Sequence, residues 1–368
     1  MPIIAGPAAR ALASLSPSQV KFIRRLPKAE LHAHLNGSIP LAILQELAQS
    51  YSPPSADGQI GVSNDTVQAG LEKLRNGVTI EAIGDFFGLF PAIYALTSTP
   101  EAMARATRGV LDAFFQADDG DEEPECTYLE LRTTPRSTET MSREVYLRTV
   151  LSVTSSYSHS LPPLPESIAH GSTRRRISVI ASLDRRMSVE VMEEIVDLAI
   201  RLKDEGLGLA GVDLCGDPNK GNVEEWKHVF EKARIGGLGI TLHIAETLEN
   251  SPEETLKLLS YKPDRLGHAT FLNEEARKIV MENQTCIEIC LTSNLLCKTA
   301  TDLDSHHIRY WLKQQHPLAI CTDDILPFRN SLTAEYALLL AKQPLGLGLT
   351  EDEVRTIAEM SLDSRFLD

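Results

Sequence analysis

Eight short apolar segments separated by stretches of helical periodicity constrain the fold of this 368-residue chain more than any other feature. Each segment is a run of aliphatic, β-branched or Cys residues about as long as one strand. Nearly continuous apolar strands are typical of parallel sheets covered on both faces. The segments are 29–35, 126–133, 177–183, 209–215, 240–244, 265–268, 286–291 and 318–322, and the helix-period stretches are 188–202, 223–233, 252–259, 274–282 and 333–342.

This alternation predicts an α/β fold, a closed (β/α)8 TIM barrel, rather than an open doubly wound sheet. The first segment lacks the glycine fingerprint of a dinucleotide-binding sheet. Polar residues also stand at the carboxyl ends of the segments, where barrel enzymes place their active sites. These residues are His32, His34, Asp184, Gly216, His243, His268 and Asp323.

We expect a single domain over residues 1–368 with an insertion after the first strand. About ninety residues separate the first two segments, too many for one helix, so several helices should form a lid over the barrel mouth at about 41–120. Residues 51–77 are rich in Ser, Gly, Pro and Asp and predict a mobile loop, and 118–125 and 158–176 predict surface loops. Residues 1–15 predict a mobile lead or a short helix.

Composition narrows the classes of partner. The formal net charge of −15 opposes binding to nucleic acid or to an anionic membrane surface. No apolar run approaches the ~20 residues of a membrane helix. The six cysteines show no CxxC spacing, which indicates reduced thiols and a cytoplasmic protein. We expect a monomer that binds a small molecule.

The His-x-His pair at the end of the first segment indicates a metal site. His32 and His34 are two residues apart, so in a strand both imidazoles point to one face and can reach one ion. His243 ends a later segment, and of the pair Asp323–Asp324 one carboxylate can ligate the metal while the other orients substrate. Three histidines and one aspartate suit a zinc-class metal and leave room for a water that the metal can acidify. The expected chemistry is hydrolytic.

Two further polar residues follow strand ends at the same mouth. Glu246 stands three residues after His243, where a carboxyl group can shuttle protons, although HxxE alone also fits a surface Glu on the following turn. His268 ends the segment 265–268. Its position favours a role beside the metal-bound water, and the alternative is a hydrogen-bonded core histidine.

Together these motifs resemble the adenosine/AMP deaminase family of metal-dependent hydrolases. They run in order along essentially the whole chain, as LPKAELHAHLNGS, YLELRTTPR, SLDRR, GVDLCGDP, HIAE, RLGHATFL, LTSN and ICTDD. The resemblance implies one Zn²⁺ per chain and the following roles for its residues: His32, His34, His243 and Asp323 bind the metal, Glu246 protonates the purine ring nitrogen next to the reacting carbon, His268 and Asp324 position and deprotonate the metal-bound water, and Gly216, Asp184, His34 and Asp324 lie along the substrate.

Within the family the chain most closely resembles the branch that converts N6-methyl-AMP to IMP and methylamine. Asn36 stands where adenosine deaminase proper is expected to carry Asp, and its neutral amide removes charge repulsion with a nucleotide phosphate. The alternative is a turn-forming Asn before Gly37. Thr133, Thr134 and Arg136 offer hydroxyl, amide and guanidinium groups to the phosphate.

An aromatic series in the expected lid has helical spacing: Phe86, Phe87, Phe90 and Tyr94. It fits a helix core as well as it fits the wall of an N6-substituent pocket, with Tyr94 reaching the sugar or phosphate.

Other functions stay open. Adenosine or adenine deaminase is the nearest alternative, and an acidic residue at position 36 would have favoured it. A catalytically silent purine-binding relative is opposed by the retention of every expected ligand together with Glu246. A binuclear amidohydrolase would need a bridging carboxylated Lys, and no strand-end position is Lys.

Overall fold

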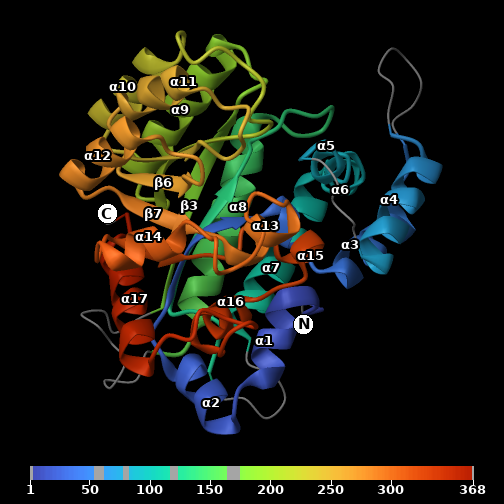
Figure 1. Ribbon diagram of the computed structural model, residues 1–368. Coiled ribbons are helices and arrows are strands. Elements are labelled where there is room, and N and C mark those ends of the chain that lie inside the picture. Colours follow the sequence, from blue (N-terminus) through green and yellow to red (C-terminus); the bar gives the residue numbers. More distant parts are fainter. Residues whose placement is uncertain (1–2, 54–61, 78–82, 117–122, 164–174, 367–368) are drawn as a thin grey trace.

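The computed structural model describes residues 3–53, 62–77, 83–116, 123–163 and 175–366, which form the (β/α)8 barrel that the sequence predicts (Figure 1). Eight parallel strands follow one another around the sheet in chain order. β8 meets β1 at a bridge between Ala33 and Asp323, where the His34 amide donates to the Asp323 carbonyl at 3.1 Å. The strands are β1 (Ala29–His34), β2 (Tyr128–Thr133), β3 (Arg176–Asp184), β4 (Leu209–Cys215), β5 (Gly239–Ile244), β6 (Arg265–His268), β7 (Cys286–Ile289) and β8 (Leu318–Ile320).

β7 and β8 end two residues earlier than predicted. Leu291 already belongs to a short helix after β7. β8 ends at Ile320, and Asp323, which has a left-handed φ of 63°, makes only an isolated bridge to β1. The apolar composition of these residues reflects their burial rather than strand geometry.

An outer layer of helices covers the strands. The predicted helical stretches are all helical, although the second begins only at Lys227, after a turn in which the Asn222 side chain accepts from the Glu224 amide at 3.1 Å. α17 packs against β8 and β1. The helices are α8 (Arg143–Ser160), α9 (Val189–Asp204), α10 (Lys227–Ile235), α11 (Pro252–Leu259), α12 (Glu274–Asn283), α13 (Leu291–Leu296), α14 (Ile308–Lys313), α15 (Ile325–Phe328), α16 (Leu332–Leu340) and α17 (Glu351–Asp363).

The chain between β1 and β2 is largely helical, and α3 to α6 lie together on one side of the barrel (Figure 1). Its elements are η1 (Asn36–Ser38), α3 (Leu41–Ser50), α4 (Asn64–Asn76), α5 (Ile83–Phe87), α6 (Phe90–Leu96) and α7 (Pro100–Phe115). The prediction of a loop was wrong for α4, because Val67, Leu71 and Leu74 form a buried stripe at helical spacing and the Ser63 side chain caps the helix. Residues 54–61, 118–122 and 164–174 of the predicted loops lie outside the described residues.

The start of the chain packs against its end. α1 (Gly6–Ser14) and α2 (Pro17–Arg25) lie beside α16, near α17 (Figure 1). The short helix expected within residues 1–15 is therefore present. Across the described residues, every helix is too short or too polar to cross a membrane.

Candidate active site

A cavity of about 850 Å³ opens at the carboxyl ends of the strands, between the barrel mouth and helices α5 and α6. Its wall contains every predicted site residue except His32, which lies fully buried just beneath it. Residues up to 290 positions apart in the chain therefore surround one cavity, because they lie at or just after the carboxyl ends of the barrel strands.

Four side chains converge at the floor of this cavity. The Nε2 atoms of His32 and His243 are 3.0 Å apart, and those of His34 and His243 are 3.2 Å apart. Asp323 Oδ1 lies 3.7 Å from His32 Nε2 and 3.5 Å from His34 Nε2. One ligand atom from each of His32, His34 and His243 lies within 4.8 Å of the other two, a spacing that suits one metal ion. The same holds for His32, His268 and Asp323.

The chemistry of this donor set fits a metal ion. His32 Nδ1 lies 2.6 Å from Glu288 Oε2, and His243 Nδ1 lies 3.0 Å from Asp213 Oδ1 and 2.8 Å from the Leu214 carbonyl. Because these neighbours accept, the ring protons belong on Nδ1 and each Nε2 offers a lone pair to the shared space. Lone pairs 3 Å apart repel one another unless a cation lies between them, and imidazole with carboxylate is the ligand set of zinc-class metals.

The surroundings of His32 and His34 keep their imidazoles unprotonated, so that a ring nitrogen of each can bind a metal ion. Burial lowers the pKa of His34 to about 3 and that of His32 well below its usual value, so both rings are neutral. Burial also lowers the pKa of His243, but the adjacent Asp213 carboxylate outweighs it and the pKa is raised overall. A more basic imidazole is a stronger metal ligand.

A buried set of charges supports the cluster from inside the barrel. Arg132 donates to Glu288 Oε2 at 2.8 Å and lies 3.3 Å from Asp213 Oδ1, so one guanidinium bridges the carboxylates behind His32 and His243. Arg265 donates to Glu288 Oε1 at 2.8 Å and pairs with Glu130. The sequence analysis missed these residues, although a charged residue inside an otherwise apolar strand, as in LELR, GVDL and CIEI, was an available signal.

Glu246, His268 and Asp324 stand above the cluster. His268 Nε2 lies 3.7 Å from Glu246 Oε1 and 3.9 Å from Asp323 Oδ2. Burial and the charge of Asp323 raise the pKa of Asp324 well above its usual value. Burial opposes ionisation of Asp323, but His268, His34 and His243 outweigh it and lower its pKa. The pKa values of the two adjacent carboxyls therefore diverge, that of Asp323 falling and that of Asp324 rising.

Left-handed backbone turns aim these side chains into the cavity. Ala245, His268 and Asp323 have φ values of 47°, 58° and 63°, which are rare for residues other than glycine. Such conformations persist only where the surrounding structure enforces them, and they gather at functional sites. The Asp324 carboxyl packs directly against the backbone of Gly37, where an added Cβ would lie 1.4 Å from Asp324 Oδ1. Only glycine therefore fits at position 37.

Another part of the cavity wall carries hydroxyl, amide and guanidinium groups. The Asn36 amide nitrogen donates to the Tyr146 hydroxyl at 3.3 Å, which lies 2.6 Å from Thr133 Oγ1, and the buried Asn36 Oδ1 has no partner within the described residues. Thr134 Oγ1 faces Cys215 Sγ at 3.7 Å. Neither Asn36 nor Thr133 is held by a charged group, so both remain able to bind a polar ligand.

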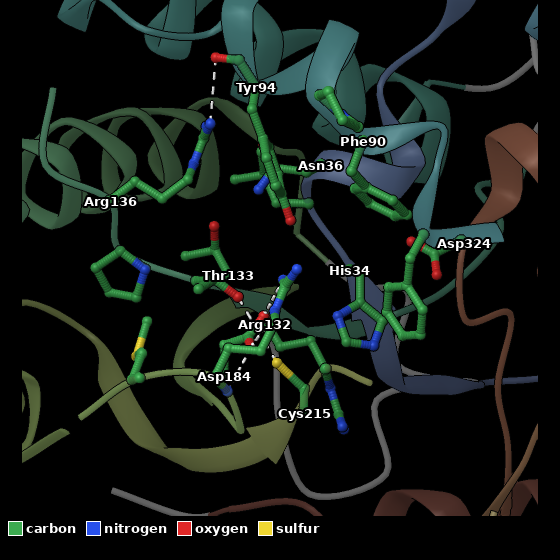
Figure 2. Close-up of a pocket in the computed structure, with 18 of the residues that line it drawn as sticks. His34, Asn36, Phe90, Tyr94, Arg132, Thr133, Arg136, Asp184, Cys215 and Asp324 are labelled. Atoms are coloured by element: carbon green, nitrogen blue, oxygen red, sulfur yellow. Dashed lines mark hydrogen bonds and ion pairs between the residues drawn. The ribbon is translucent and has the colours of Figure 1, made fainter. Parts of the chain in front are cut away.

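Arg136 joins this part of the wall to helix α6. Its guanidinium lies 4.0 Å from the centre of the Tyr94 ring and donates to the Tyr94 carbonyl at 3.2 Å and to Thr97 Oγ1 at 2.9 Å (Figure 2). Nε is buried without a partner in the described structure. The Tyr94 ring extends from α6 so that its hydroxyl points into the cavity (Figure 2).

Asp184 and Gly216 form one side of the wall. Arg186 donates to Asp184 Oδ1 at 2.8 Å and to Oδ2 at 2.6 Å, so the carboxylate that was expected to lie along the substrate is already paired with a guanidinium. Gly216 has a φ of 94°, and an added Cβ would lie 2.7 Å from Asp184 Oδ1. The sequence analysis missed Arg186 even though it belongs to the SLDRR motif.

The aromatic series packs over the cavity from the other side. Phe86 stacks on Phe328 with ring centres 5.4 Å apart and meets the Phe90 ring edge-on at 5.2 Å. These rings both form a small core and line the cavity, so the two interpretations of the series are compatible. Phe328, which follows the Asp323–Asp324 pair on α15, was not predicted.

Known proteins resemble this chain over nearly its whole length. The family model described as adenosine deaminase matches residues 27–368. The N6-mAMP deaminase of Arabidopsis thaliana is 34% identical over 94% of this chain and 94% of its own length, and the N6-methyl-AMP deaminase of Homo sapiens is 32% identical over 95% and 91%. A crystal structure of Arabidopsis ADAL complexed with IMP superposes with a TM-score of 0.79 at 32% identity, covering 95% of this chain and 94% of that one.

Proposed function

Because this chain belongs to the adenosine deaminase family, we propose that it is a zinc-dependent hydrolase that converts N6-methyl-AMP and water to IMP and methylamine. The relatives named above support a purine nucleotide as substrate, since two bear the name of this reaction and one binds its product. Structures of Arabidopsis ADAL with IMP and with GMP both have a nucleoside monophosphate bound.

One observation from this chain carries the choice of a nucleotide over a nucleoside. Asn36, which is 5% exposed, adds no negative charge to the wall of the cavity. The wall also contains the guanidinium groups of Arg136 and Arg186, and the Asp184 carboxylate is neutralised by Arg186. A phosphate beside this wall meets hydroxyl, amide and guanidinium donors, which are the groups that bind it well.

In this proposal His32, His34, His243 and Asp323 hold the zinc, and Thr133, Thr134 and Arg136 face the phosphate. A bound zinc supplies Lewis acidity and a hydrolytic nucleophile at neutral pH. Glu246 donates a proton to the ring nitrogen beside C6, which makes that carbon electrophilic.

His268 and Asp324 orient the attacking water and accept its proton. The water oxygen forms a bond to C6, and the bond from C6 to the exocyclic nitrogen breaks as the proton reaches the departing amine. The second water proton leaves the C6 oxygen, which becomes the carbonyl of IMP, and restores the proton on Glu246. Tyr94 and the aromatic side chains of Phe86, Phe87 and Phe90 exclude bulk water from the end of the substrate that carries the N6 substituent. Gly216, through its backbone, and Asp184 lie along the purine and ribose.

We also propose that the protein works as a cytoplasmic monomer with one zinc per chain, and that α3 to α6 act as a lid on a single barrel domain. All six cysteines are free thiols, as a reducing compartment requires. The helices between β1 and β2 form one wall of the cavity, so their movement would control access to it.

The test compares purified protein on N6-methyl-AMP, AMP, N6-methyladenosine, adenosine and adenine, with measurement of the purine product and of the released amine. We expect the highest kcat/KM on N6-methyl-AMP, with one methylamine per IMP. A preference for adenosine or adenine would assign the chain to the alternative deaminases, and turnover of none of the five would favour a silent purine-binding relative.

The matched control is Glu246→Gln, whose amide keeps the shape of the side chain but cannot donate the required proton. It should retain zinc and lose about 10²- to 10⁴-fold in kcat. A near-normal rate in this variant would remove Glu246 from the mechanism.

A further inference from the structure

His307 contacts the backbone of His268 from a distant part of the chain. It precedes α14 and lies 39 residues after His268, and its Nε2 atom is 2.9 Å from the His268 carbonyl oxygen. A carbonyl can only accept, so the proton of the His307 ring belongs on Nε2. Burial lowers the pKa of His307 to about 4, which keeps the ring neutral, and Nδ1 has no partner among the described residues.

The backbone that His307 holds is strained. His268 and Ala269 are consecutive non-glycine residues with φ values of 58° and 49°. The Ala269 amide is directed at two carbonyls, those of Ile244 at 3.1 Å and Gly267 at 2.7 Å. A left-handed pair of this kind persists only where the neighbouring structure holds it from several directions.

The direction of the His268 ring depends on this turn. Its Nε2 atom faces Glu246 Oε1 at 3.7 Å and Asp323 Oδ2 at 3.9 Å, while its Nδ1 atom is buried without a partner in the described residues. The ring itself therefore has weak polar anchors, and apart from its packing against the His32 and His243 rings its direction depends on the backbone. A bond to the His268 carbonyl acts on that backbone directly.

We infer that His307 is a positioning residue for His268, holding the left-handed turn that aims the His268 imidazole at the reacting water. The inference rests on the deaminase function proposed above. It adds a residue that touches neither the substrate nor the candidate metal ligands.

The chain contains a matched control. His316 makes the same kind of bond, from Nε2 to the Thr285 carbonyl at 2.8 Å, and its Nδ1 is likewise without a partner in the described structure. Burial lowers the pKa of His316 too. Thr285 precedes β7, so this bond lies at the amino ends of the strands, on the opposite side of the barrel from the cavity.

The experiment compares His307→Leu, His307→Asn, His307→Gln and His316→Leu in the zinc-loaded enzyme. Gln places its amide N–H near the position of Nε2, whereas Asn is too short to reach the carbonyl. We expect His307→Leu and His307→Asn to lose roughly ten- to a hundredfold in kcat, the cost of misplacing a catalytic group by about 1 Å, with KM changed less than twofold. His307→Gln should recover most of the rate.

His316→Leu should show a fall in melting temperature like that of His307→Leu but a normal kcat. Zinc content and affinity for IMP should be unchanged in all four variants. If His307→Leu does not fold, the ratio of kcat between the Gln and Asn variants decides the question.

Equal kcat in those two variants, or an equal loss in His316→Leu, would overturn the positioning role. Failure of the proposed function looks different, because the wild-type enzyme would then prefer adenosine or adenine, or turn over none of the purine substrates.

Discussion

At the scale of single residues, the proposed choice of a nucleotide over a nucleoside rests on one buried amide, that of Asn36. Asn36 is buried, its nitrogen is held by Tyr146, and its oxygen faces no partner within the described residues. A carboxylate at this position would add a negative charge at the part of the cavity proposed to bind phosphate. Coulomb repulsion at contact distance is on the order of a few kcal/mol at intermediate dielectric.

Asn36→Asp should therefore lower kcat/KM for N6-methyl-AMP by roughly ten- to a hundredfold more than for N6-methyladenosine. The control Asn36→Ser removes the amide without adding charge and should affect both substrates alike. Steady-state kinetics on the two substrates check this. Equal losses in Asn36→Asp on both would show that phosphate does not lie near this position.

The site residues at strand ends were predictable from sequence, because barrel enzymes place their active sites at the carboxyl ends of the strands. The structure brings the predicted site residues to one cavity, with His32 buried beneath its wall, while their individual roles stay predictions. Glu288, Asp213 and Arg186 were missed for a physical reason. Their importance comes from partners in other strands, and the sequence does not show which of its buried charges meet.

At the scale of elements, α16 links two parts of the site through one buried carboxyl. Glu335 accepts from the Thr292 amide at 3.2 Å and from the Asn330 side chain at 2.8 Å, and Asn330 also donates to the Thr322 carbonyl at 3.0 Å. α16 thereby fixes the start of α13 and the segment that leads from β8 to Asp323. Burial raises the pKa of Glu335 to about 7.

This raised pKa makes stability depend on pH. Between about 4.5 and 7 the folded state holds a proton that the unfolded state has lost, so the free energy of unfolding falls as pH rises through that window. The difference of about 2.5 pKa units corresponds to roughly 3 kcal/mol.

Glu335→Gln removes this ionisation. Its unfolding free energy, measured by urea denaturation, should rise relative to wild type by up to roughly 3 kcal/mol between pH 4.5 and pH 8, because only wild type must then bury a charge. Taking the difference between the two proteins at each pH cancels the loss of metal in acid. Parallel profiles for the two proteins would contradict the assignment.

Apolar stripes predicted some of the long helices and missed others, since α8 and α17, with 18 and 13 residues, were not among the predicted stretches. The helical stretches after β3, β5 and β6 match α9, α11 and α12 closely, because each spans at least two turns and shows a full apolar stripe. α13 and α14 have six residues each, too few for a periodic pattern. They form because tertiary contacts stabilise them, and their local sequence carries little of that information.

At the scale of the whole molecule, the barrel closes where the candidate metal ligands lie. β1 and β8 meet at the isolated bridge between Ala33 and Asp323, and His32 and His34 flank Ala33 on β1. A metal held by His32, His34, His243 and Asp323 would join this seam to β5. It would bind the folded chain only, and would stabilise it by roughly 3 kcal/mol at a hundredfold excess over Kd.

We therefore expect the purified protein to contain about one zinc per chain. Treatment with a chelator should lower its Tm by several degrees, and added zinc should restore it. His32→Ala and Asp323→Ala should lose most of the zinc and this response, whereas His228→Ala, at an exposed histidine on α10, should behave as wild type. Calorimetry with metal analysis checks the expectation, and full occupancy in both ligand variants would refute the assignment.

The buried charges inside the barrel have a consequence for how this sequence can diverge. Arg132 pairs with both Glu288 and Asp213, and Arg265 pairs with both Glu288 and Glu130. The five side chains thus form one connected set of ion pairs. Replacing Arg132 or Arg265 leaves Asp213 or Glu130 without its guanidinium partner in the core, at a cost of about 3–5 kcal/mol, a large part of the roughly 5–15 kcal/mol that stabilises an ordinary domain. Mutations at these positions are therefore tolerated only in compensating combinations, and in an evolving lineage the set should be inherited or lost as one unit.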